Sequence, residues 1–314
     1  MSKRKPKYWP PVPEPLTAPV VDNHTHLALR PEQIPSPQGE RLSVTEQLAR
    51  AVQVGVRAVI SSGCQFDELA GTVSLALDIK GSQIELPQVY AALAIHPNEA
   101  ALHRGISDPS PDGLTPELEP RHRTSLEDAV AEVGRLALEN PGVVVAIGES
   151  GLDYYRTADI GRLAQIESFK MHIELAKQLD LPLQIHDRDA HSDTVATLLE
   201  VGAPQRTVFH CFSGDVELAE VLAEHGWYAS FAGPVSYPAN TVLREALRAM
   251  PPELVLVETD APYLSAQTWR GFPNASYLIA YTVRSIAETL EMPERETCEM
   301  LQLNTVSLYG LNIL

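Results

Sequence analysis

Short apolar runs alternate with amphipathic stretches from residue 19 onward. Several of these runs are continuously apolar, as expected for strands that are buried on both faces of a parallel sheet. The intervening stretches have apolar residues spaced three and four apart, which is the spacing of one helix face. The runs that we predict to be strands are residues 20–24, 56–62, 88–95, 143–148, 181–185, 206–209, 227–232 and 254–258.

The stretch at residues 161–180 shows the helical spacing most clearly, with Ile166, Phe169 and Ile173 on one face. Two further helix starts, at residues 43–46 and 124–127, carry a capping box, in which a hydroxyl residue precedes a glutamate by three positions. Eight strand–helix units predict an α/β fold of the (β/α)8 TIM-barrel type, for which about 250 residues suffice. No glycine-rich phosphate motif follows the first run, which argues against a dinucleotide-binding open sheet.

A single domain is expected at residues 19–314, preceded by a short tail at residues 1–18. The tail contains four basic residues and closely spaced prolines, so we expect a flexible and extended segment. The polar connection at residues 97–123 follows the third predicted strand. It is therefore expected on the face where barrel enzymes carry their sites.

The composition limits which binding partners and which cellular compartment are expected for the chain. The chain has 24 basic and 41 acidic residues and a net charge of −17, which disfavours a broad surface for coating nucleic acid. Its three cysteines form no CxxC pair, as is typical of a reducing compartment. No run approaches the roughly 18 apolar residues of a membrane span, and the N-terminus lacks the apolar region of a secretory signal. We therefore expect a cytoplasmic protein without a membrane partner.

Side chains that bind metals follow several of the predicted strands. His24 and His26 lie two positions apart at the end of the first run, so they point to the same side of an extended strand. Each candidate alone also fits a hydrogen-bonded or ion-paired core position. Parallel strands of one barrel end at one mouth, however, so the whole set is expected to converge there. The candidate ligands are His24, His26, Glu149, His186, His210 and Asp260, with Glu258 expected to support them from one layer deeper.

This set holds four imidazoles, two carboxylates and no thiolate, which suits Zn, Mn, Co, Ni or Fe better than Mg. Six ligands exceed the needs of one tetrahedral site, and two divalent ions bridged by one carboxylate account for them better. Two ions about 3.5–4 Å apart activate a shared water at neutral pH. The pattern therefore predicts a metallohydrolase with two divalent metal ions.

Seven ordered sequence blocks together resemble the TatD family of metal-dependent deoxyribonucleases, within the amidohydrolase superfamily. The resemblance covers nearly all of residues 20–312, although residues 265–269 lack the prolines often found there. It implies a barrel with a two-metal site that hydrolyses DNA phosphodiesters, often from the 3′ end of single strands. The blocks are DNHTH at residues 22–26, IHP at 95–97, GESGLDYY at 148–155, LPLQIHDRDA at 181–190, HCFSG at 210–214, ETDAPYL at 258–264 and RGFPN at 270–274.

The same resemblance implies a role for each matching residue, with DNA ends or single-stranded DNA as the substrate. The implied ligands of one metal are His24, His26, Glu149 and Asp260, and those of the second are the bridging Glu149 with His186 and His210. The implied catalytic set is Asp260, which assists proton transfer, together with Glu149 and His96. The implied substrate contacts are His96, which faces the scissile phosphate, Arg188, Arg270 and Asn274. Asp153 is expected to orient the loop after Glu149.

Two other functions fit the same ligands. A metal-activated water also attacks amide, ester or lactone carbonyls, and the acidic composition mildly favours such a small substrate. A non-catalytic metal-binding partner protein that kept the barrel is disfavoured, because the ligand set is complete. The sequence leaves the oligomeric state open, and a monomer is sufficient for the predicted site.

Overall fold

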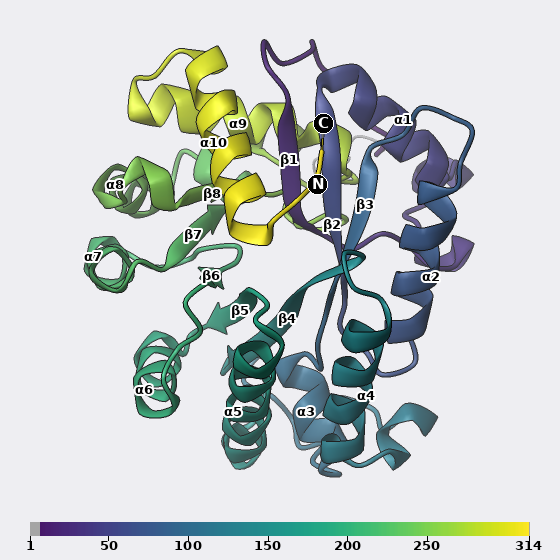
Figure 1. The fold of residues 1–314 in the computed structure, drawn as a ribbon, viewed down its shortest axis with the longest axis vertical. Coiled ribbons are helices and arrows are strands. Elements are labelled where there is room, and N and C mark those ends of the chain that lie inside the picture. Colours follow the sequence, from purple (N-terminus) through teal and green to yellow (C-terminus); the bar gives the residue numbers. More distant parts are fainter. Residues whose placement is uncertain (1–6, 314) are drawn as a thin grey trace, which may run out of the picture.

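Eight parallel strands pair in the order in which they occur in the chain and curve into a nearly closed barrel (Figure 1). The computed structural model describes residues 7–313. Every predicted strand is present, which confirms the single-domain TIM-barrel fold. The strands are β1 (Val20–Thr25), β2 (Val56–Gly63), β3 (Gln88–Leu93), β4 (Val144–Asp153), β5 (Leu183–Arg188), β6 (Thr207–Phe209), β7 (Tyr228–Phe231) and β8 (Val255–Val257).

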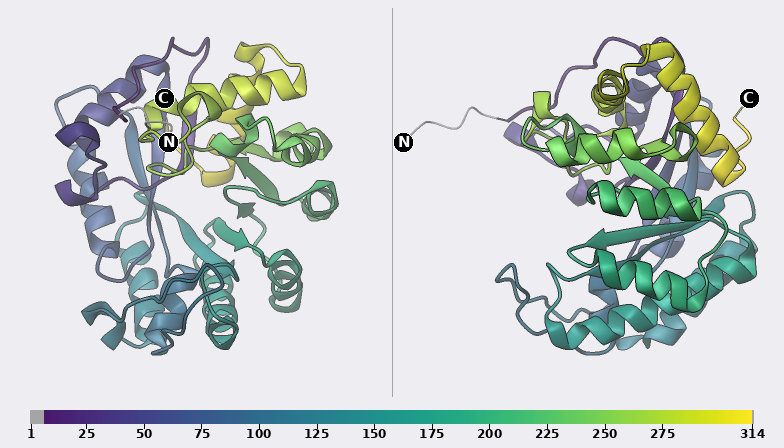
Figure 2. Two further views of the ribbon diagram at one scale, coloured as in Figure 1. Left: turned by 180° about the vertical axis from the view of Figure 1, so that it is seen from behind. Right: turned by 90° about the vertical axis from the view of Figure 1, so that its left-hand side faces the viewer.

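The helices cover the outside of the barrel, as the two further views show (Figure 2). None of the helices within residues 7–313 has the length and apolar content needed to cross a membrane. The helix predicted at residues 161–180 is α5. The helices are α1 (Val44–Val54), α2 (Leu69–Lys80), α3 (Pro97–His103), α4 (Leu126–Glu139), α5 (Arg162–Leu179), α6 (His191–Val201), α7 (Val216–His225), α8 (Thr241–Ala249), α9 (Ile279–Leu290) and α10 (Glu294–Tyr309).

One of the two predicted capping boxes has the expected geometry. At α1, the hydroxyl of Ser43 accepts the N–H of Glu46, and the Glu46 carboxylate accepts the N–H of Ser43. The box predicted at residues 124–127 is wrong by one position. There Ser125 is the cap of α4, and its hydroxyl accepts the N–H of Asp128 at 3.1 Å. Two adjacent hydroxyl residues made the start of this helix ambiguous in the sequence.

Strands β4 and β5 extend farther than the sequence predicted, because they remain paired as far as Asp153 and Arg188. Glu149 and His186 therefore lie within strands rather than just beyond them. Gly151 makes this close pairing possible. Its φ of 140° is strained for other residues, and a Cβ there would lie 2.1 Å from the carbonyl oxygen of His186.

The interior of the barrel is layered along its axis. The lowest layer is apolar and contains alternate residues of the strands, such as Val21, Ile60 and Leu256, packed against Leu308 and Leu311 from the C-terminal end. The next layer is polar and buried: it contains Asn23, Gln184, Ser230, Glu258 and the hydroxyl of Tyr309. The candidate metal ligands lie above it, at the carboxyl ends of the strands. The second apolar core lies between the strands and the surrounding helices.

Strands β1 and β8 close the barrel mainly through side chains and the backbone beyond β8. The carboxylate of Asp22 accepts the N–H of Thr259 at 2.8 Å and its hydroxyl at 2.6 Å. Asn23 donates from its side chain to the carbonyl of Val257, and the N–H of Asp260 donates to the carbonyl of His24. These bonds fix the ends of β1 and β8 beside one another, and with them His24 and Asp260.

The N-terminal segment that precedes β1 is extended, and its described part is attached to the barrel. Trp9 and Leu16 are buried, and the carbonyl of Pro10 accepts the hydroxyl of Tyr277 at 2.6 Å. The N–H of Leu16 bonds to the carbonyl of Val54 at the end of α1. The sequence predicted a flexible tail at residues 1–18 and did not indicate this attachment. Residues 1–6 lie outside the described part of the chain.

The long connection at residues 97–123 is partly helical, since it begins with α3 and ends in a 3₁₀ turn at Pro120–Arg123. A buried ion-pair cluster joins its two ends. The carboxylate of Glu99, in the first turn of α3, lies 2.7 Å from Arg121 Nε and 2.9 Å from His122 Nε2. Because His96 is the N-cap of α3, this cluster helps to hold His96 at the mouth of the barrel.

Replacement of Asp22 by alanine is expected to lower the free energy of unfolding by roughly 1–3 kcal/mol, because it leaves the buried N–H of Thr259 without a partner. Thr259→Val removes the hydroxyl bond to Asp22 and the longer one from the N–H of Ala261 but keeps the backbone bond to Asp22, so it should have a smaller effect. Urea denaturation monitored by circular dichroism measures both. The exposed Glu220 on α7 supplies the control variant Glu220→Ala. Equal stability of Asp22→Ala and this control would show that the bonds between β1 and β8 contribute little.

Candidate metal centre

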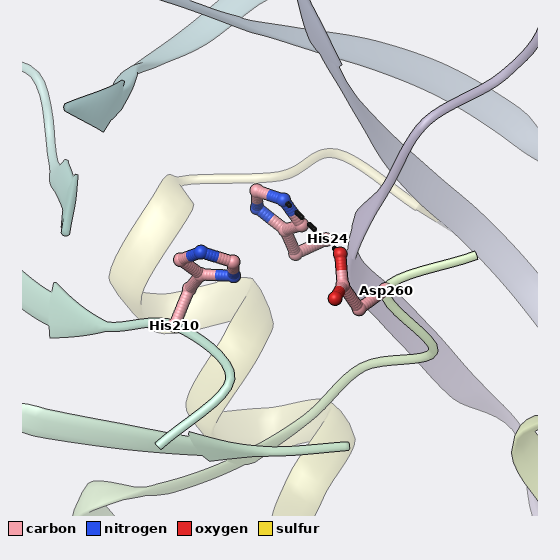
Figure 3. Close-up of side chains that lie close together, drawn as sticks. All are labelled: His24, His210 and Asp260. Atoms are coloured by element: carbon pink, nitrogen blue, oxygen red, sulfur yellow. Dashed lines mark ion pairs between the residues drawn. The ribbon is translucent and has the colours of Figure 1, made fainter. Parts of the chain in front are cut away.

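All six predicted metal ligands meet at the carboxyl end of the barrel. The ligand atoms of His24, His210 and Asp260 lie within 4.8 Å of one another, and so do those of His24, His26 and Glu149. In Figure 3 the imidazoles of His24 and His210 lie nearly parallel, with ring centroids 4.0 Å apart, and the carboxylate of Asp260 points toward them. The convergence of residues from opposite sides of the barrel is therefore present in the fold.

Glu149 lies at the centre of this cluster. Its side chain is only 6% exposed, and nitrogen atoms of five histidines surround its two oxygens. Its Oε2 is fully buried, and the nearest of the facing nitrogens is Nε2 of His210, in a contact that lacks hydrogen-bond geometry. A buried carboxylate oxygen of this kind requires a compensating positive charge. The nitrogen–oxygen distances are 3.5 Å for His24, 3.8 Å for His26, 3.5 Å for His96, 3.6 Å for His186 and 2.5 Å for His210.

Three of these imidazoles have a hydrogen-bond acceptor on the nitrogen that points away from the centre. An acceptor there holds the proton on the distal nitrogen and leaves the lone pair of the proximal one free for a metal. The pairs are His24 Nδ1 with Gln184 Oε1 at 3.0 Å, His210 Nδ1 with Glu258 Oε1 at 3.3 Å, and His186 Nε2 with Asp153 Oδ2 at 3.1 Å. Glu258 thus lies behind His210 and supports it, as the sequence predicted.

Asp153 has a second task, which matches the expectation that it orients the chain after Glu149. Its other oxygen, Oδ1, accepts the N–H of Tyr155 at 3.0 Å and that of Arg156 at 2.8 Å. One buried carboxylate therefore orients both the imidazole of His186 and the loop beyond β4.

His96 differs from the other histidines of the cluster. Its Nδ1 accepts the backbone N–H of Asn98 at 3.1 Å, so the neutral ring carries its proton on Nε2. Burial lowers the pKa of His96 to about 4, which keeps the ring neutral at physiological pH. Nε2 faces Glu149 as an N–H donor, and a nitrogen that carries a proton cannot ligate a metal. Although His96 lies near Glu149 and His186, this geometry suits a hydrogen bond to a bound substrate.

The histidines of the centre differ in protonation: burial and the neighbouring His210 lower the pKa of His24, whereas His186 and His210 are drawn toward the charged form. Burial opposes protonation, but the carboxylates of Asp153 and Glu149 outweigh it and raise the pKa of His186 to about 9. Despite burial, Glu149 and Glu258 likewise raise the pKa of His210. Divalent metal ions bind such ligands by displacing their protons. The buried carboxylate of Glu149 and the imidazole nitrogens that face it therefore fit a metal centre.

Asp260 completes the cluster from the segment that follows β8. Its Oδ1 lies 3.4 Å from Nε2 of His26 and 4.0 Å from Nε2 of His24. Asn274 fixes this segment, because its amide Nδ2 donates to the carbonyls of Thr259 at 2.9 Å and Tyr263 at 2.5 Å. Both amide hydrogens of Asn274 are thus used within the protein, and its contact with substrate stays a prediction.

Arg188 and Arg270 lie at the rim with their charges available. The guanidinium of Arg188 stacks on the ring of Tyr155, 4.0 Å from its centroid, and that of Arg270 stacks on Tyr237 at 4.3 Å. Within residues 7–313 neither guanidinium takes part in an ion pair with a carboxylate. Stacking fixes a guanidinium and leaves its N–H groups free, so both are suited to bind an anion.

Sequence reasoning missed two buried neighbours of the centre. Gln184 bonds to His24 and, through its Nε2, to the carbonyl of Asn23. A glutamine two positions before a ligand histidine in an apolar run is a signal that could have identified it. Cys64, one of the three cysteines, lies with its Sγ 3.6 Å from Oε1 of Glu149. Cys64 directly follows β2, and this position at the carboxyl end of a strand could have indicated that it lies near the centre.

Comparison with known proteins agrees with this geometry. The profile of the family described as "TatD related DNase" matches residues 21–310. The chain belongs to this family. A relative from Mycobacterium tuberculosis (strain ATCC 25618 / H37Rv), an "uncharacterized metal-dependent hydrolase TatD", is 36% identical over 296 residues, which cover 93% of this chain and 98% of that protein. TatD relatives are thus metal-dependent hydrolases, and this chain is one as well.

Solved structures of TatD proteins share the barrel. The crystal structure of YjjV, a TatD homologue from Escherichia coli K12, superposes with a TM-score of 0.74 at 25% identity and covers 93% of this chain and 98% of its own. A TatD family hydrolase from Entamoeba histolytica superposes with a TM-score of 0.76 at 17% identity, with coverages of 95% and 100%. The fold thus extends across distant members of the TatD family.

Replacement of Glu258 by glutamine is expected to weaken divalent metal binding about 10- to 100-fold, because it removes the carboxylate that orients His210. Competition of Zn²⁺ between the protein and a chromogenic chelator measures the affinity. Glu253→Gln, at an exposed position just before β8, is the matched control and should bind metal as the wild type does. Wild-type affinity in Glu258→Gln would remove Glu258 from any supporting role.

Proposed function

We propose that this TatD protein is a two-metal phosphodiesterase that hydrolyses DNA from the end of a single strand. The observation that carries the proposal is the position of Glu149, both of whose carboxylate oxygens face imidazoles of the candidate ligands. His26 approaches Oε1, and His24, His186 and His210 approach Oε2. A central carboxylate that offers both oxygens to a set of this size supports two bridged ions rather than one.

Each group of residues has a distinct task in this proposal. Bound divalent ions would lower the pKa of an attacking water and offset the charge that develops on the phosphate. Asp260 accepts a proton from the attacking water, since its carboxylate reaches into the centre from the rim and no arginine or lysine within residues 7–313 forms an ion pair with it. Thr259 and Asn274, which hold the backbone on either side of Asp260, keep its carboxylate oriented.

The substrate phosphate is bound by neutral and cationic donors. His96 donates from Nε2 to a phosphate oxygen, as its tautomer requires. Arg188 and Arg270 offer unpaired guanidinium groups at the rim, and planar guanidinium groups match phosphate oxygens in pairs. The net charge of −17 disfavours a broad DNA-binding surface, so this small basic region supports binding of a strand end rather than a long duplex.

A small carbonyl substrate is the second candidate. The acidic composition favours it, and the same ligands would serve an amide, ester or lactone hydrolase. A panel that compares 3′-labelled single-stranded DNA with acyl substrates, in the presence of Mg²⁺, Mn²⁺, Co²⁺ or Zn²⁺, separates the two. Cleavage of acyl substrates alone would replace the first proposal by the second. A protein that binds metal stoichiometrically but turns over neither class would be a non-catalytic partner.

Replacement of His24 or Glu149 by alanine is expected to abolish hydrolysis, because each removes a ligand from the centre while the strands stay paired. Activity is measured on 3′-labelled single-stranded DNA after metal reloading, and folding by circular dichroism. The matched controls are His225→Ala and Glu139→Ala, at exposed positions on α7 and α4. Wild-type turnover by a reloaded His24→Ala or Glu149→Ala protein would rule out this assignment.

Replacement of His96 by alanine is expected to lower kcat about 10²- to 10³-fold, the effect of losing one preorganised donor to the reacting group. Its metal content should stay at the wild-type level, because His96 is assigned as a donor and not a ligand. Elemental analysis of the purified variant therefore distinguishes the two roles. Loss of one equivalent of metal would make His96 a ligand of the centre.

A further inference from the structure

A largely exposed aromatic ring lies beside the metal centre. Tyr263, three residues after Asp260, is 60% exposed. Its ring centroid lies 5.8 Å from that of His26, at an interplanar angle of 72°, so the two rings meet edge to face. Most large aromatic rings lose such exposure by packing, and an exposed ring at the mouth of a site is available to bind a ligand.

The backbone of Tyr263 is held firmly although its side chain is exposed. Its N–H donates to the carbonyl of Asp260 at 2.9 Å, and its carbonyl accepts from Asn274 Nδ2 at 2.5 Å. The ring is therefore presented from a fixed position relative to Asp260. A rigid aromatic group loses little conformational entropy when it binds a flat partner.

The other two tyrosines at the rim are already occupied. Arg188 covers the ring of Tyr155, and Arg270 covers that of Tyr237. No arginine or lysine within residues 7–313 lies over Tyr263. Arg270 belongs to the same segment between β8 and α9 as Tyr263, so this segment presents both an open π-face and a cation. Base stacking with phosphate neutralisation is how proteins bind single-stranded nucleic acid.

We propose that Tyr263 stacks on the nucleobase next to the scissile phosphate and thereby makes the enzyme specific for an unpaired strand end. This proposal rests on the proposed DNA phosphodiesterase function. A base within a duplex is stacked on its neighbours and cannot offer its face to Tyr263 without fraying. Stacking tolerates any base, so Tyr263 selects for strandedness and not for sequence.

The test combines three variants of Tyr263 with intact and abasic oligonucleotides. On a single-stranded oligonucleotide, Tyr263→Ala and Tyr263→Leu should raise KM about 5- to 150-fold, whereas Tyr263→Phe keeps the ring and should change it little. Leu303→Ala, at an exposed apolar position on α10, is the control and should behave as the wild type does. Metal content should be the same in all of these proteins.

The abasic substrates decide whether stacking is the cause. Two abasic oligonucleotides are compared, one lacking the terminal base and one lacking the penultimate base. One of these substrates should raise the KM of the wild type as much as Tyr263→Ala does on the intact oligonucleotide. On that substrate, Tyr263→Ala should not raise KM any further. Tyr263→Ala should also reduce the preference for single strands over blunt duplexes. Two results would overturn the stacking role and leave the phosphodiesterase proposal standing. One is that Tyr263→Ala raises KM equally on intact and on both abasic substrates. The other is a KM for Tyr263→Phe as high as that for Tyr263→Ala. If the wild type cleaves no oligonucleotide with any of the four metals, the phosphodiesterase proposal is wrong and the stacking proposal is wrong with it.

Discussion

The structure depends on one buried charge. Glu149 lies within β4, and five histidines face its buried carboxylate. A carboxylate in such a place is stable only if positive charge reaches it. Other features of the centre serve this need. Gln184, Asp153 and Glu258 accept hydrogen bonds from the distal nitrogens of His24, His186 and His210. Gly151 lets β4 lie close against β5, and a buried polar layer lies beneath the ligands.

Rigid elements bring the functional groups together. Ligands come from within or just beyond β1, β4, β5, β6 and β8, so their backbones are fixed by the sheet rather than by flexible loops. The groups assigned to substrate lie on the connections that follow the strands, such as Tyr263 and Arg270 after β8 and His96 at the start of α3. In such a barrel the connections can vary with the substrate while the strands keep the centre in place.

The alternation of apolar runs was enough to predict the strands, and the residues at their ends were enough to predict which side chains would meet. The sequence mispredicted the cap of α4, because Thr124 and Ser125 are both suitable N-cap residues. It also mispredicted the end of β4, because this strand continues past its apolar run. Long-range partners had no local signal. The bond between Gln184 and His24 joins residues 160 positions apart, and the attachment of Pro10 to Tyr277 spans 267. Only the folded chain brings such residues together.

The bonds between β1 and β8 have a consequence for synthesis of the protein. Asp22 and Thr259 are 237 positions apart. His24 lies in the first strand and His26 directly after it, whereas Asp260 follows the last strand. A ribosome releases the N-terminal strands long before the final one exists. The growing chain therefore cannot assemble the complete set of candidate ligands before residue 260 is made, and any product truncated before that residue lacks one of them.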